Sequence, residues 1–188
     1  MTLLVNTAGK RSSRLLDVLT GEAKATSSSG TRVLYALSCY FDREALIALT
    51  TALARAVRSA GSTLVGCRIA VDVGDWTRQR CDRKALVRDV AAAAKFSVKD
   101  VELHAIHVSG CLVHAKGYAL ISPPRTKSRQ RRGFVAVTSG NLTQRGLGLA
   151  RSSNVELAHI SRDSEALEAF RSHFHWLTKA PPLREAPA

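Results

Sequence analysis

Segments with two different apolar periods alternate along this chain from residue 32 onward, and this alternation constrains the fold more than any other feature. Short apolar runs predict buried strands, whereas apolar residues every three to four positions predict amphipathic helices. The predicted strands are 33–39, 63–71, 101–108, 111–121, 134–138 and 155–160. The predicted helices run from Asp42, a favourable N-cap, to before Gly61, over 78–96, and from near Asp163. This order predicts an α/β fold, with a mixed, largely parallel sheet flanked by helices on both faces.

The chain divides into one main domain and two shorter ends. Residues 1–30 hold a short predicted strand near Leu3, a brief helix near Leu15 and a Ser-rich connection, and we expect them to form a separable N-terminal arm. Residues 31–178 form the main domain, and 179–188 a Pro-rich flexible tail. With 188 residues, of which 45% are hydrophobic, the chain can bury a core without disulfides or a structural metal.

The cysteines and histidines do not predict a metal site. The four cysteines stand singly, with no Cys-x-x-Cys spacing, and are Cys39, Cys67, Cys81 and Cys111. All but the third lie among apolar residues and are expected to be reduced core residues. His104 and His107 fall on one predicted strand, where a spacing of three places them on opposite faces. We therefore predict no metal and no cofactor.

The net charge predicts a polyanionic partner. Lys and Arg number 28 against 15 Asp and Glu, a net charge of +13. Such an excess on a folded domain is typical of proteins that bind nucleic acid, although a generally basic surface is an alternative. The densest basic run lies between two predicted strands, and the residues expected to contact nucleic acid there are Arg125, Lys127, Arg129, Arg131 and Arg132. The sequence holds no apolar run of about 20 residues and no apolar leader, so we expect a cytoplasmic protein without a membrane partner.

Three short polar segments follow one another in the second half of the chain. His114 and Lys116 lie two residues apart on a predicted strand, which places a titratable nucleophile beside a positive charge on one face. Ser139-Gly140-Asn141 follows the next strand and offers polar donors to an anion. Glu156 begins a buried strand, where a carboxylate needs a partner such as a histidine ring. Each segment is common alone, and the ordered set is the stronger indication.

This ordered set resembles the phospholipase D-like superfamily with its His-x-Lys phosphodiesterase motif, and the segment 33–41 resembles that family's first strand. The resemblance covers about residues 32–177 and makes 31–178 a phospholipase D-like catalytic domain. It implies that His114 is the nucleophile, that Lys116 and Asn141 bind phosphate with help from Ser139, and that Glu156 orients the histidine ring. No cofactor or metal is implied.

Two departures from the family pattern stand in this sequence. The family's aspartate, five positions after the lysine, is replaced by Ile121, and residues 122–132 lengthen the segment between the histidine and the serine. The aspartate is not usually a direct catalyst, so its loss weakens the motif match more than the chemistry.

The chain carries one His-x-Lys motif. Family members with one copy resemble small bacterial endonucleases and restriction-enzyme nuclease domains, which pair two chains to build one site, because one histidine attacks while another protonates the leaving oxygen. We therefore predict a homodimeric, metal-independent phosphodiesterase that hydrolyses nucleic acid through a phosphohistidine, with DNA favoured. The resemblance also makes a restriction or defence setting and further subunits plausible. The alternatives are a phospholipid hydrolase or transphosphatidylase, and a catalytically silent nucleic-acid-binding module.

Overall fold

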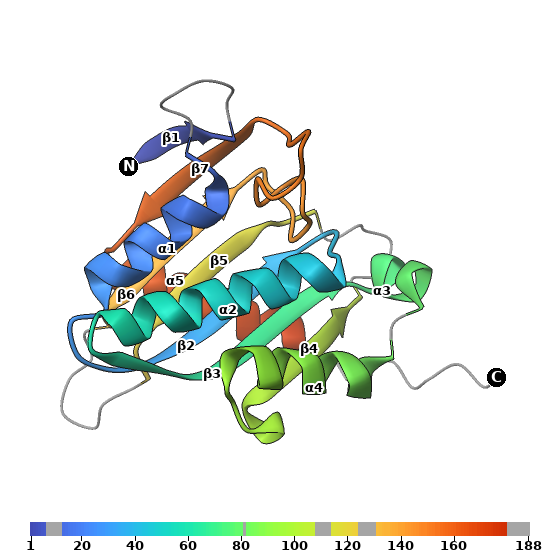
Figure 1. Ribbon diagram of the computed structural model, residues 1–188, viewed down its shortest axis with the longest axis horizontal. Coiled ribbons are helices and arrows are strands. Elements are labelled where there is room, and N and C mark those ends of the chain that lie inside the picture. Colours follow the sequence, from blue (N-terminus) through green and yellow to red (C-terminus); the bar gives the residue numbers. More distant parts are fainter. Residues whose placement is uncertain (7–12, 81, 108–113, 124–130, 180–188) are drawn as a thin grey trace.

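The computed structural model describes residues 1–6, 13–80, 82–107, 114–123 and 131–179. The strands are β1 (Thr2–Val5), β2 (Gly30–Ser38), β3 (Ser62–Asp72), β4 (Val101–Ile106), β5 (Gly117–Ile121), β6 (Gly133–Thr138) and β7 (Glu156–Ser161). The helices are α1 (Leu15–Thr26), α2 (Arg43–Ser59), α3 (Val73–Gln79), α4 (Arg83–Ala94) and α5 (Ser164–Thr178). The strands form one sheet in the order β1-β7-β6-β5-β2-β3-β4 (Figure 1).

The sheet is mixed, as predicted, but it is not largely parallel. Only β2 with β3 and β3 with β4 pair in parallel, while β5 pairs antiparallel with β2 and with β6. The remaining neighbours, β6 with β7 and β7 with β1, are also antiparallel. The physical reason lies in the connections: α2 carries the chain back between β2 and β3, whereas the described residues that connect β5, β6 and β7 include no helix.

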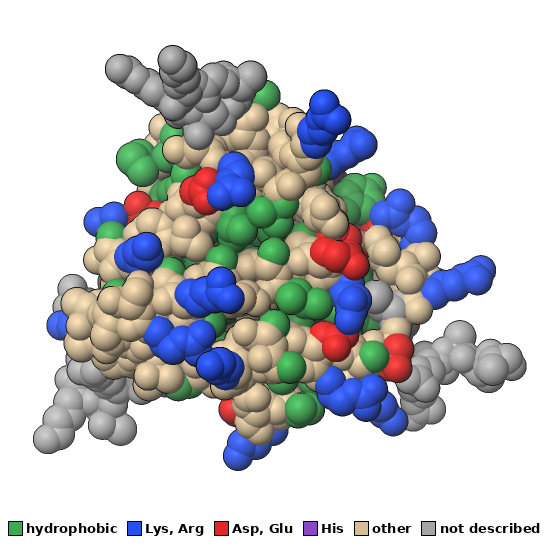
Figure 2. All heavy atoms as spheres, viewed as in Figure 1, with side chains coloured by type: hydrophobic (Ala, Val, Ile, Leu, Met, Phe, Trp, Pro, Cys, Tyr) green, Lys and Arg blue, Asp and Glu red, His purple; other side chains and the backbone are tan. Residues whose placement is uncertain are grey.

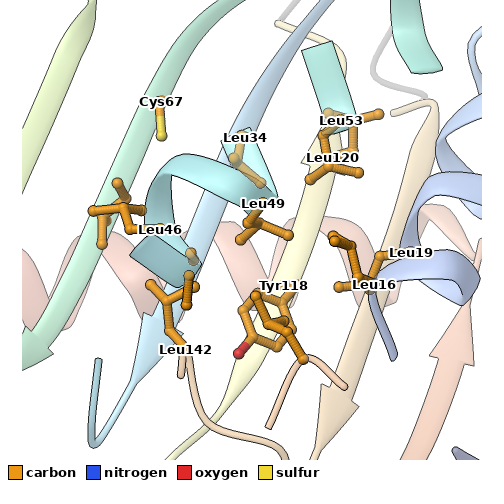
Figure 3. Packing of buried hydrophobic residues seen from close by; sticks show 14 of the residues in the cluster. Leu16, Leu19, Leu34, Leu46, Leu49, Leu53, Cys67, Tyr118, Leu120 and Leu142 are labelled. Carbon is orange, nitrogen blue, oxygen red and sulfur yellow. The ribbon is translucent and has the colours of Figure 1, made fainter. Parts of the chain in front are cut away.

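Helices cover both faces of the sheet, which confirms that part of the prediction. Helices α1, α2 and α4 lie on one face and α5 on the other (Figure 1). Strand β2 shows how the sheet serves both layers, because Leu34 belongs to the first core and Tyr35 to the second. Figure 3 shows leucines of α1 and α2 packed on side chains of β2 and β5. The predicted Asp42 cap is confirmed, since its carboxylate accepts a hydrogen bond from Ala45 N.

Two predicted elements differ from the structure at their ends. The helix expected over 78–96 is two helices, because Arg80 ends α3 in the left-handed conformation, at φ 47°, and the Asp82 carboxylate caps α4 by accepting from Lys84 N. The strand expected over 111–121 begins only at Gly117, and residues 111–113 lie outside the described part. The predicted tail after 179 also lies outside it.

The N-terminal residues do not form a separable arm. Strand β1 adds to the sheet beside β7, and α1 packs against α2 with Leu15 and Leu19 fully buried. Glu22 of α1 also forms an ion pair with Arg162, which follows β7. The prediction was wrong because residues 1–30 have too few apolar residues to form a core of their own, and the sequence does not show that these residues pack into the core of the main domain. In the structure they complete that core.

Candidate active site

The predicted catalytic residues gather at one end of the sheet. Lys116 directly precedes β5, and Ser139 directly follows the antiparallel neighbour β6, so both lie where β5 begins and β6 ends. A hydrogen bond of 3.2 Å from Thr138 N to Lys116 O joins the two segments. Glu156 begins β7 at the same end, and β2 ends there as well. The antiparallel order of β5, β6 and β7 therefore brings together three motif segments that are separated in the sequence.

His114 and Lys116 are in contact. Lys116 Nζ lies 2.8 Å from Nε2 and 3.1 Å from Nδ1 of His114. An ammonium group only donates, so a hydrogen bond here requires a ring nitrogen that carries no proton. The contact thus suits a neutral imidazole, which is the nucleophilic form.

Lys116 is a buried cation next to the ring of His114. Its residue is only 8% exposed, and within the described ranges no acidic side chain lies within ion-pair distance of Nζ. Buried lysine charges are rare unless they are paired, because removing an ammonium from water is costly. His114 itself is exposed to solvent, so an anion that binds next to its ring can provide the negative charge that pairs with Lys116.

The structure does not pair Glu156 with His114. The Glu156 carboxylate accepts a hydrogen bond of 2.5 Å from Ser139 Oγ, and that oxygen in turn accepts from Leu157 N at 3.0 Å. Ser139 therefore has its proton engaged by Glu156 and is not free to donate to a phosphate in this arrangement. Burial, with the nearby Glu156 charge, raises the pKa of the Tyr118 hydroxyl, which donates to Gly140 O.

Asn141 is half-buried, and one end of its side-chain amide forms a hydrogen bond with the backbone. Its Oδ1 accepts from Tyr40 N at 3.3 Å, while its Nδ2 has no partner among the described residues and is available as a donor. The preceding glycine lies in a crowded place: a Cβ on Gly140 would lie 2.8 Å from Leu15 Cδ2 and 3.1 Å from Gly146 O. A side chain at position 140 would therefore crowd the turn that presents Asn141.

Asn6 holds the loop that supports this turn, a role the sequence did not reveal. Its Nδ2 donates to Gly146 O at 3.0 Å, and its Oδ1 accepts from Leu15 N at 2.8 Å. Gly146 in turn packs against Asn141, because a Cβ on Gly146 would lie 2.3 Å from Asn141 O. Asn6 adopts φ 59°, a left-handed conformation that asparagine tolerates better than most residues, and this preference is the only local signal for it.

Asn6→Ala is expected to lower the free energy of unfolding by about 1–3 kcal/mol. Two hydrogen bonds are lost, and alanine tolerates the left-handed conformation at position 6 less well than asparagine does. Amide hydrogen exchange should also accelerate at Leu147 and Leu149, whose N–H groups close the supported loop. Asn6→Asp is the matched control, since it keeps the acceptor for Leu15 N and loses only the donor to Gly146. Equal exchange in Asn6→Asp and wild type would contradict the role given to that donor.

The basic loop predicted to bind nucleic acid joins β5 to β6 at the opposite end of these strands from His114. Five residues of β5 separate the two ends, about 17 Å. Arg131 is folded back: its Nε donates to Glu168 at 2.9 Å, and its side chain is only 12% exposed. With Arg171, it holds the pKa of Glu168 well below its usual range, at about 2. Arg132 is exposed, and Arg125, Lys127 and Arg129 lie outside the described residues. Other Lys and Arg side chains spread over the face covered by α1, α2 and α4 (Figure 2).

Ile121, which replaces the family's aspartate, lies at that far end of β5. It is 1% exposed and packs in the core beneath α5. Position 121 therefore cannot contact the His114 side, and the replacement leaves the candidate site unchanged.

Cys39 and Cys67 are buried thiols, as predicted, and Cys81 and Cys111 lie outside the described residues. Burial raises the pKa of Cys39, against the opposing effects of the Lys116 charge and a hydrogen bond with Tyr40. Among the described residues, no three His, Cys, Asp or Glu side chains are grouped closely enough to hold a metal ion. Among the predicted site residues, Lys116 and Asn141 are the donors that can bind an anion in this arrangement.

Comparison with solved structures gives the fold. No protein-family model and no curated sequence matches this chain. Its structure is similar to that of Nuc, a phospholipase D family member from Salmonella typhimurium, with a TM-score of 0.51 and 16% identity over 94% of this chain and 93% of the other. It is also similar to NucT from Helicobacter pylori, with a TM-score of 0.50 and 12% identity over 88% of each chain. In its fold, this chain is phospholipase D-like.

Proposed function

We propose that this protein is a metal-independent phosphodiesterase that hydrolyses nucleic acid, most readily DNA, at a site shared by two protomers. The observation that carries the proposal is Lys116, a buried ammonium that touches the ring of His114 and has no acidic partner among the described residues. Asn141 adds an amide donor from the adjacent turn. A nucleophile beside two fixed donors for an anion is what attack on a phosphodiester requires. The net charge of +13 favours a polyanionic substrate.

The proposed reaction has two displacements. In the first, an unprotonated ring nitrogen of His114 attacks phosphorus, the P–N bond forms and the P–O bond to the leaving group breaks. A second, protonated histidine gives its proton to the leaving oxygen. In the second displacement, water attacks phosphorus, returns one proton to that histidine and breaks the P–N bond. Lys116 and Asn141 stabilise the charge on the non-bridging oxygens in both steps.

The need for a second histidine supports the homodimer. One protomer supplies one histidine in the His-x-Lys motif, and the two steps require two rings in opposite protonation states. A two-fold axis close to His114 would bring both copies of this residue to one phosphate.

The function is tested by incubating the protein with plasmid, single-stranded DNA and RNA, each with and without excess EDTA. We expect cleavage that survives the chelator, because lysine and asparagine do the charge stabilisation that a metal would do. Complete loss with EDTA that Mg²⁺ restores would contradict the mechanism. Binding without cleavage of any substrate would favour the silent binding module.

Mixing wild-type and His114→Ala protomers tests the shared site. If each site needs two histidines, only wild-type dimers are active, and an equal mixture retains about one quarter of the activity at constant total protein. Independent sites would leave about one half. Subunit exchange must first be shown with labelled protomers, and a linear dependence on the wild-type fraction would rule out the shared site.

The phospholipid alternative would use the same chemistry. In the described part of the chain, no helix has the length and apolar character to cross a membrane. Hydrolysis of phosphatidylcholine vesicles at a rate above that of DNA would favour the alternative.

A further inference from the structure

An exposed aromatic ring and a guanidinium lie together beside Asn141. Tyr40, two residues after β2, is 38% exposed, and the Arg78 guanidinium lies over its ring at 5.4 Å from the centroid. The Arg78 side chain is 66% exposed. We call this pair the Tyr40–Arg78 surface. The mechanism above uses neither residue.

The surface is held in place by the short helix α3, which lies at the end of the sheet (Figure 1). Asp75, whose side chain is 1% exposed, accepts from Phe41 N at 2.9 Å and pairs with Arg78. Gln79 Nε2 donates to Phe41 O at 2.9 Å, and the rings of Phe41 and Trp76 stack with centroids 5.6 Å apart. Backbone and guanidinium are therefore ordered before any ligand arrives, which reduces the entropy cost of binding.

The surface adjoins the candidate phosphate site directly. Tyr40 N donates to Asn141 Oδ1, and the amide of that same side chain offers its Nδ2 to the phosphate. Cys39, the residue before Tyr40, is close enough to Lys116 for the lysine charge to act on its thiol. Arg78 uses Nε and Nη2 for Asp75, so Nη1 remains available to donate to another oxygen.

We propose that the Tyr40–Arg78 surface binds the nucleotide next to the scissile phosphate, with Tyr40 stacking on its base and Arg78 donating to its sugar or phosphate oxygens. The proposal rests on the proposed function and specifies its substrate as single-stranded nucleic acid. An unpaired base exposes its π-face to an aromatic side chain, whereas bases in a duplex are stacked on one another. Stacking tolerates any base, so the surface provides affinity for single strands without reading sequence.

Binding of 12-mer oligonucleotides to His114→Ala protein tests the proposal without depending on turnover. The probes are a mixed-sequence single strand, its duplex, and a 12-mer of abasic nucleotides with the same phosphates. We expect the single strand to bind about 5- to 100-fold more tightly than the abasic strand, the range for stacking one base. Adding Tyr40→Ala or Tyr40→Leu should reduce this ratio to near one, whereas Tyr40→Phe should keep it.

Two controls separate the surface from general effects. Trp176→Ala removes another exposed aromatic side chain, on α5, and should leave the ratio unchanged. Arg78→Gln should weaken all single-stranded probes, whereas Arg58→Gln, the same charge change at the far end of α2, should not. An unchanged ratio in both Tyr40→Ala and Tyr40→Leu overturns the inference. Tyr40-dependent binding by a protein whose wild type cleaves nothing would retain the inference and reject the proposed function; cleavage without Tyr40 dependence would do the reverse.

Discussion

His114→Ala is expected to reduce phosphodiester cleavage by about 10³-fold or more while nucleic-acid affinity stays within a few-fold of wild type. The nucleophile is lost, and water must attack phosphorus unaided. Binding depends on many basic side chains and therefore survives. Single-turnover cleavage of a labelled single strand and fluorescence anisotropy of the same strand measure the two effects.

The control for this variant is His107→Ala. His107 is an exposed histidine directly after β4, and β4 ends at the same end of the sheet where His114 lies. The His107→Ala protein should cleave at the wild-type rate. Trapping the reaction with acid should show phosphate bound to wild-type protein through an acid-labile bond and none on His114→Ala. Residual cleavage by His114→Ala above one tenth of wild type would exclude His114 as the nucleophile.

Lys116→Met is expected to slow cleavage by about 10²- to 10³-fold, the cost of removing one preorganised donor from a developing charge. The effect should fall mainly on kcat, because Lys116 stabilises charge that grows in the transition state. Methionine fills a similar volume. Removing a buried charge that has no acidic partner in the described part of the chain should not destabilise the fold. Thermal unfolding of Lys116→Met should thus occur at or above the wild-type temperature.

Lys24→Met is the matched control, since Lys24 is an exposed lysine in the last turn of α1. It should cleave normally and show only the small loss of affinity caused by one surface charge. A Lys116→Met protein that cleaves within a few-fold of wild type would show that Lys116 is a buried structural lysine.

The sequence by itself determined the layers of the fold and the central pair of the site. Apolar periodicity distinguishes helices from strands because side chains return to the buried face every three to four residues in a helix and every two residues in a strand. Capping residues such as Asp42 locate the helix ends. His114 and Lys116 are two residues apart, so the backbone alone keeps them close. Their contact was therefore predictable even though the predicted strand begins later, at Gly117.

The tertiary structure decided everything that depends on residues distant in the sequence. Periodicity does not encode strand direction, so the four antiparallel neighbours and the addition of β1 beside β7 emerge only when the core is assembled. The same holds for the contact of Asn6 with Gly146, 140 residues apart. The basic segment between β5 and β6 lies between the motif's residues in sequence, but it joins the ends of these strands that are farthest from Lys116 and Ser139. An antiparallel pair places that connection at the opposite end of both strands, since each strand must be traversed before the chain turns.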